Sequence, residues 1–114
     1  MKNNTTSITV NILVKKEADI WVGHCLELDI VTTANDIKAL KKDMDDLIAA
    51  QIEYAFVNDN LGNLFRPAPK EVWEEFYKCK AQTEDKILVD SKSKPFVPPW
   101  IIAKTCTLKD NLAA

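Results

Sequence analysis

The first part of the chain alternates between apolar and polar residues and is rich in β-branched side chains. This period of two over residues 8–15 predicts a strand with one buried face. A polar break at 16–19 has the length of a hairpin turn, and the apolar run at 20–25 predicts a central strand. Further alternation over 26–32 predicts a short third strand. Together these segments predict a three-stranded antiparallel meander.

Apolar residues then recur at spacings of three and four, which is the pattern of an amphipathic α-helix. The stripe consists of Ile37, Leu40, Met44, Leu47, Ile48, Ile52, Ala55 and Phe56. Thr33 or Asn35 is suited to cap the start of this helix, and Gly62 is suited to its end because glycine adopts the left-handed conformation easily. A helix of about six turns must lie across a sheet to bury such a stripe.

Prolines punctuate the second half of the chain and divide it into shorter elements. A proline in the first turn suits a second helix over residues 70–80. Residues 82–86 are polar and predict a turn, followed by a brief strand at 87–89. The prolines within 95–99 keep the chain extended and exclude a helix. They lead into a strand over 100–108, which we expect at an edge of the sheet because prolines stand at its entry.

These elements predict a single α+β domain, in which a three-stranded antiparallel meander packs on one long helix. A shorter second helix and a C-terminal strand complete it. The domain spans 1–114, with a core at 8–57, an extension at 64–108 and flexible ends. A length of 114 residues with 46% hydrophobic and 28% charged residues fits one globular core. No apolar run approaches the roughly 18 residues of a membrane span, so we expect no membrane partner.

Charge and cysteine content narrow the class of protein. The formal net charge is -2, which provides no general attraction to nucleic acid. Cys25, Cys79 and Cys106 are an odd set without the spacing of paired ligands, and we expect them to be reduced thiols. The polar residues 1–7 are not followed by a signal-peptide core. We therefore expect a cytoplasmic protein.

Few residues are candidates for catalysis or metal binding. His24 and Cys25 are adjacent in a predicted strand, so their side chains point to opposite faces and cannot readily act as a pair. Glu27 and Asp29 share one parity of the predicted strand, and with Asp36 they leave a small metal-dependent hydrolase open as an alternative. The more common interpretation of such a pair is that both carboxylates simply face solvent. The chain has only two glycines, which excludes a glycine-rich phosphate loop. We expect no enzyme, no metal site and no cofactor.

Acidic residues of the long helix and apolar residues of the second half are the better functional candidates. The candidate partner-binding residues are Asp43, Asp46, Glu53, Trp73, Tyr77, Trp100 and Ile101. The acidic residues would repel a nucleic-acid backbone and attract a basic protein, although a solvated helix face is the ordinary interpretation. Clustered exposed aromatic residues mark interfaces, or they close the core. Because exposed aromatics also stack bases, RNA binding stays open as an alternative function.

A resemblance enters at the second and third predicted strands. The stretch 21–33 reads Trp-Val-Gly-His-Cys-Leu-Glu-Leu-Asp-Ile-Val-Thr-Thr and resembles the strand, Glu-Leu turn and short strand of HicB-type antitoxins. Residues 39–52 resemble the helix that follows in that family, so the resemblance covers about 8–57. The departures from the family's pattern are Leu26 for its proline, Ala34-Asn35 for its glycine and Lys38-Ala39 for its glutamate–alanine pair.

The resemblance implies a truncated ribonuclease H-like fold without that fold's catalytic acidic cluster. It also implies that the domain binds and occludes a small basic HicA-like toxin, a protein that cleaves mRNA. Members of the family usually add a helix-turn-helix or ribbon-helix-helix segment. The prolines and polar breaks after Lys80 leave no room for such a helix pair, so we expect no autonomous DNA-binding module. Open strand edges and surplus aromatic residues lead us to expect a homodimer.

Overall fold

The computed structural model describes residues 8–89 and 100–108. The expectations for flexible ends and for an extended stretch at 95–99 fall outside these residues. The elements are, in chain order, β1 (Ile8–Glu17), β2 (Ile20–Cys25), β3 (Ile30–Ala34), α1 (Ile37–Val57), the 3₁₀ turn η1 (Leu61–Asn63), α2 (Lys70–Tyr77), β4 (Gln82–Leu88) and β5 (Trp100–Leu108). The fold is α+β, as the sequence predicts. None of the helices described is long and apolar enough to cross a membrane.

The five strands form one mixed sheet in the order β3-β2-β1-β5-β4. β1 pairs with β2 and β2 with β3, both antiparallel, which confirms the predicted meander. β5 runs parallel to β1 and antiparallel to β4. The prediction that the C-terminal strand lies at an edge is therefore wrong. The prolines precede this strand, so all nine of its residues keep the N–H groups that an interior strand needs.

β4 begins at Gln82, within the segment for which the sequence predicts a turn. The turn prediction for residues 82–86 is wrong because β4 lies at the edge of the sheet, where only Ile87 of its side chains is buried. An exposed edge strand has no need of alternating apolar residues, so its sequence is as polar as that of a turn.

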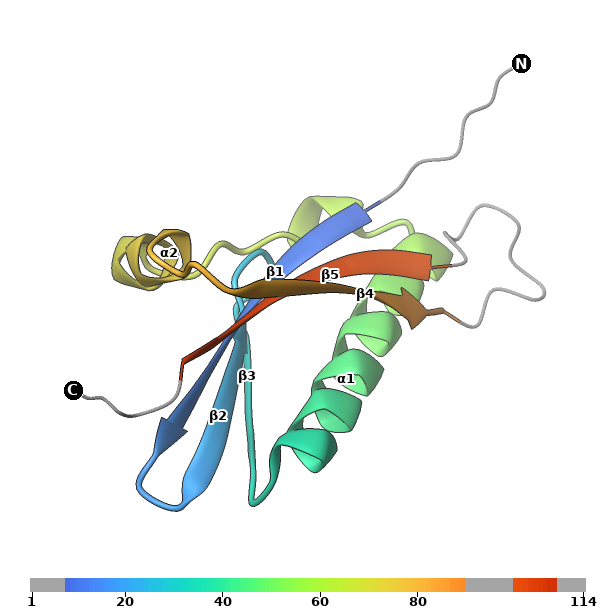
Figure 1. Cartoon of the computed structure of the whole chain (residues 1–114). Helices are drawn as coiled ribbons and strands as arrows, with labels where there is room; N and C mark the ends of the chain where they lie inside the picture. Colours follow the sequence, from blue (N-terminus) through green and yellow to red (C-terminus); the bar gives the residue numbers. More distant parts are fainter. Residues whose placement is uncertain (1–7, 90–99, 109–114) are drawn as a thin grey trace.

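α1 and α2 lie on opposite faces of the sheet (Figure 1). The cap of α1 is Asp36, whose Oδ1 accepts a hydrogen bond of 2.8 Å from the backbone N–H of Ala39. The predicted caps are wrong, because Thr33 still pairs with β2 and Asn35 comes one residue too early. Beyond the other end, Asp59 takes the left-handed conformation expected of a glycine, with φ of 52°.

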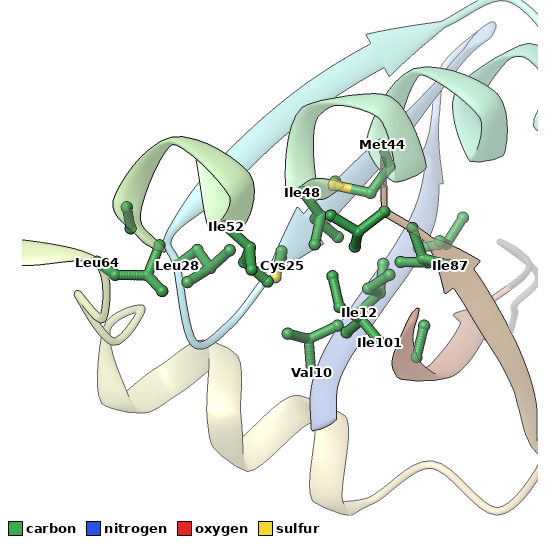
Figure 2. Packing of buried hydrophobic residues seen from close by; sticks show 14 of the residues in the cluster. Val10, Ile12, Cys25, Leu28, Met44, Ile48, Ile52, Leu64, Ile87 and Ile101 are labelled. Carbon is green, nitrogen blue, oxygen red and sulfur yellow. The ribbon is translucent and has the colours of Figure 1, made fainter. Parts of the chain in front are cut away.

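The main core lies between α1 and the sheet, and Figure 2 shows α1 side chains pointing at the strands. The buried residues of α1 are Leu40, Met44, Ile48, Ile52 and Ala55. They pack against strand residues that include Val10, Ile12 and Ile101. A Cβ at Gly23 would lie 3.1 Å from the Met44 Cε, so glycine allows α1 to approach β2 closely. The predicted stripe is confirmed along its centre, whereas Ile37 and Leu47 at its margins are 43% and 40% exposed.

A second core lies under α2, on the opposite face of the sheet. Its buried residues are Leu13, Leu26, Ala68, Phe76 and Cys106. α2 ends at Tyr77, three residues before the predicted end, and a disulfide then joins Cys79 to Cys106 on β5. The prediction of three reduced thiols is wrong. The two cysteines are 27 residues apart in sequence, and they meet because α2 packs on the face of the sheet that carries Leu13 of β1 and Cys106 of β5. Cys25 is free and buried.

Candidate functional site

An open cleft of about 260 Å³ lies on the α1 face of the sheet, between the first half of α1 and the strands β4 and β5. It exists because α1 crosses the sheet obliquely and packs mainly on β2 and β3, which leaves the far strands thinly covered. The apolar floor of the cleft consists of Ile12, Val14, Leu40 and Met44. These side chains belong to the main core and are only 1–5% exposed, so the floor of the cleft adds little apolar surface in contact with solvent.

Threonine side chains form the strand side of the cleft. Thr83 of β4 lies opposite Thr105 of β5, and Thr107 follows on the same face. Each hydroxyl can both donate and accept a hydrogen bond. The β-branched side chains also suit the strands that carry them. The cleft thus combines an apolar floor with hydroxyl groups along one wall, an arrangement that can hold a ligand or a side chain of another protein.

One lysine is shared between two carboxylates at the mouth of the cleft. The Lys41 Nζ lies 3.0 Å from the Asp85 Oδ2 and 3.7 Å from the Asp45 Oδ2. Burial raises the pKa of the Asp45 carboxyl, and the neighbouring Lys41 partly opposes that shift. Because Lys41 is half exposed, each pair contributes at most about 1 kcal/mol to stability. The Lys41–Asp85 pair connects α1 to β4 without holding the cleft shut, whereas the Lys41–Asp45 pair lies within α1.

Sequence reasoning missed this cleft. Thr83 and Asp85 fall in the segment for which the sequence predicts a turn, so no face was assigned to them. A signal was present in the C-terminal strand, where Trp100, Ile102, Cys106 and Leu108 share one parity. The other parity ends in Thr105 and Thr107, which indicates that the face they share is incompletely covered there.

The predicted acidic residues lie on the outer side of α1. Asp43 and Asp46 are exposed and Glu53 is half-buried. Their spacings of three and seven place them on one side of the helix. The Lys42 Nζ donates a hydrogen bond of 2.9 Å to the Asp46 Oδ2, and this contact raises the pKa of Lys42. The negative charge of this surface is therefore smaller than the count of its carboxylates implies.

The predicted apolar candidates are divided between exposed and buried positions. Trp73 and Tyr77 of α2 have ring centroids 5.9 Å apart, and Tyr77 is 70% exposed. Trp100 is 37% exposed, and the Lys86 Nζ lies 4.9 Å from its ring centroid. Ile101 is fully buried, so its assignment to a partner-binding surface is wrong. It points to the α1 face of β5, which is an interior strand rather than the expected edge.

The residues considered for catalysis are held in separate contacts. The His24 Nε2 lies 2.6 Å from the Asp29 Oδ1. The Glu27 carboxylate accepts hydrogen bonds of 2.7 Å and 2.6 Å from the backbone N–H and the side-chain amide of Asn11. Asp36 caps α1. Glu27 and Asp29 lie in the turn between β2 and β3, so the prediction that they share a strand face is wrong. Across residues 8–89 and 100–108, no three potential metal ligands gather in one group.

The stretch 21–33, on which the resemblance rests, forms β2, the following turn and most of β3, and α1 crosses the same face. Cys25 points into the main core while His24 faces away from it toward Asp29, as expected for neighbours in a strand. No protein-family model, no curated protein and no solved structure matches this chain.

Proposed function

We propose that this chain is a binding domain of the HicB antitoxin type that neutralises a small basic HicA-like toxin by covering it. The cleft beside α1 is the observation that carries the proposal, because it offers an apolar hollow whose lining also holds two carboxylates and two lysines. The resemblance over residues 21–33 supports the same interpretation, since that stretch forms the strand pair on which α1 packs.

The chemistry of the cleft suits one protruding side chain of a protein partner. An apolar side chain would lie against Ile37, the exposed apolar residue of the lining, and its neighbouring backbone could bond the threonine hydroxyls. A lysine or arginine next to that side chain would compete with Lys41 for Asp85, replacing one ion pair by another. Asp43 and Glu53 would orient the approach of a basic protein over a longer range.

This function needs no reacting group, metal or cofactor in the chain itself. Covering a partner's active surface requires only shape, apolar contact and charge of the opposite sign. The proposed target cleaves mRNA, so we also place the domain in the cytoplasm. The candidate contacts on α2, Trp73 and Tyr77, lie on the other face of the sheet, where they could extend the covered area.

Coexpression with the product of a neighbouring small open reading frame, followed by pull-down, tests the proposal. The variant Thr83→Trp places a large ring at the cleft, because Thr83 lines it and is exposed. The variant Gln82→Trp is the matched control, since Gln82 is exposed on the opposite face of the same strand. We expect a small basic protein to copurify with the wild type and with the control, but not with Thr83→Trp. The proposal would be contradicted if no small basic protein copurified with the wild type, or if the protein copurified equally with Thr83→Trp and Gln82→Trp.

RNA binding is the second candidate, and Trp100 is the residue that favours it. Its ring is partly exposed beneath Lys86, and Lys104 is an exposed cation on the same face of β5. An aromatic ring with nearby lysines can stack a base and contact a phosphate. Fluorescence anisotropy with labelled single-stranded RNA at low salt tests this, with Trp100→Ala as the variant. Salt-dependent binding that the variant loses would support RNA binding, and no binding at low salt would exclude it.

A further inference from the structure

We propose that Cys79 and Cys106 form a reversible redox pair whose state controls how firmly α2 is held on the sheet. In this pair Cys79 exchanges with thiols and disulfides in solution, and Cys106 is the buried cysteine that opens or closes the bond from within. The inference goes beyond the proposed function and does not depend on it. It places a site of thiol–disulfide exchange at the end of α2.

The two cysteines of the disulfide differ in their access to solvent. Cys79 follows α2 and is partly exposed, whereas Cys106 is fully buried in the second core. A thiolate must reach a sulfur atom in order to attack a disulfide. Cys79 is therefore the cysteine that an external thiol attacks, and Cys106 is the thiol that leaves.

Reduction by a dithiol takes two exchange steps. A thiolate of the dithiol attacks the Cys79 Sγ, the bond to Cys106 breaks, and Cys106 leaves as a thiolate that takes up a proton. The second thiol of the reductant then attacks the mixed disulfide, which frees Cys79 as a thiol and leaves the reductant as a cyclic disulfide. The pair gains two electrons and two protons in total. With a small disulfide as the oxidant, Cys79 first forms a mixed disulfide, and Cys106 then displaces the small thiol.

The sheet keeps the two cysteines close together when the bond is open. Gln82 of β4 lies opposite Cys106 in the register of β4 and β5, and Gln82 comes three residues after Cys79. The main core includes side chains of both strands but neither of these cysteines. Reduction is therefore local, and closing the bond again requires only a short loop.

α2, at the margin of the molecule in Figure 1, is the element that depends on the bond. It has eight residues, and so short a helix is not stable in water by itself. Its start has no side-chain cap, and Phe76 is its only buried residue. The Lys15 Nζ lies 3.2 Å from the Glu75 Oε1, but both side chains are more than a third exposed, so this pair contributes at most about 1 kcal/mol. With the bond open, the apolar contacts of the second core alone hold the helix firmly.

Mass spectrometry of the reduced full chain treated with glutathione disulfide tests the two roles, using matched variants. In Cys106→Ala we expect Cys79 to form a stable mixed disulfide with glutathione. In Cys79→Ala we expect Cys106 to be modified at least about tenfold more slowly, because a buried thiol reacts only after local opening. The wild type should form the Cys79–Cys106 bond without accumulating a mixed disulfide. Cys25, which is buried in the main core, is the internal reference for a buried thiol.

Two measurements on the wild type make the test independent of whether a variant folds. A short pulse of iodoacetamide on the reduced chain should label Cys79 at least about tenfold faster than Cys106. Hydrogen exchange at short labelling times should show that α2 is protected in the oxidised chain and unprotected in the reduced chain. α1 should stay protected in both chains at these times, because it belongs to the main core.

Four results would overturn the inference. Equal labelling of Cys79 and Cys106 in the folded chain would contradict their separate roles. A mixed disulfide that persists in the wild type would show that Cys106 does not displace the small thiol. Equal protection of α2 in the oxidised and reduced chains would show that the bond does not control this helix. Loss of protection in α1 together with α2 would show that reduction unfolds the whole domain.

Discussion

Reduction of the Cys79–Cys106 disulfide should lower the stability of the domain by an amount that follows from its position. The bond closes a loop with a sequence separation of 27 residues. Closing a loop of this length in the unfolded chain corresponds to about 3.5 kcal/mol at 25 °C on the chain-entropy account. With a urea m-value of about 1.5 kcal/mol/M, the unfolding midpoint should fall by about 2 M. The loss should appear first in α2, because the bond and the second core hold that helix on the sheet.

Urea unfolding of the air-oxidised protein, with and without a reductant, measures this difference. The double variant Cys79→Ala/Cys106→Ala is the control, and the reductant should leave its midpoint unchanged. Thiol titration of the oxidised wild type in denaturant should detect one free thiol, that of Cys25. Detection of three thiols, or equal midpoints for the oxidised and reduced wild type, would refute the reasoning.

Three further predictions concern the core, a turn and a thiol. Ile52→Ala should destabilise the domain by about 2–5 kcal/mol in urea unfolding, because Ile52 is fully buried between α1 and the sheet; a loss below about 1 kcal/mol would contradict that packing. Ala18→Gly should stabilise it by up to about 1 kcal/mol, because Ala18 has a φ of 57° in the β1–β2 turn. Ala50→Gly, at an exposed position of α1, should instead lower the free energy of unfolding by about 1 kcal/mol. If both glycine variants change the free energy of unfolding in the same direction, the comparison is refuted. Burial raises the pKa of Cys25 to about 12, so its thiol should not react with a thiol reagent at pH 8 unless the protein unfolds.

The first half of the fold could be predicted from the sequence because burial there is one-sided. β1 and α1 each present one face to the same core, and this leaves periods of two and of three to four in the sequence. The caps were harder to predict. Asp36 competes with Asn35 and Thr33 as the capping residue, and only the end of β3 at Ala34 decides between them.

The second half could be predicted only in part, because its structure depends on contacts between distant segments. The position of β5 between β1 and β4 is fixed by pairing over long sequence separations. That position buries Ile101 and brings Cys106 under Cys79. Such pairings leave no local pattern in the sequence. The cleft has the same origin, since its floor, wall and mouth come from α1, β1, β4 and β5.

The candidate site could also be predicted from the sequence only in part. The acidic residues of α1 could be predicted because a helix displays its outer side at regular spacing. The threonine wall could not be, because Thr83 and Thr105 meet only through the pairing of β4 with β5. Exposed aromatic residues were expected to gather, yet Trp100 is placed by β5 and Tyr77 by α2.

A growth-rescue assay tests the central claim most directly. The gene for the neighbouring small basic protein is induced in a bacterial host together with this chain, and colony formation is counted. The account predicts that the wild type and Gln82→Trp restore growth, while Thr83→Trp, expressed at the same level, does not. Rescue by Thr83→Trp as strong as that by the wild type, or no rescue by the wild type at all, would contradict it.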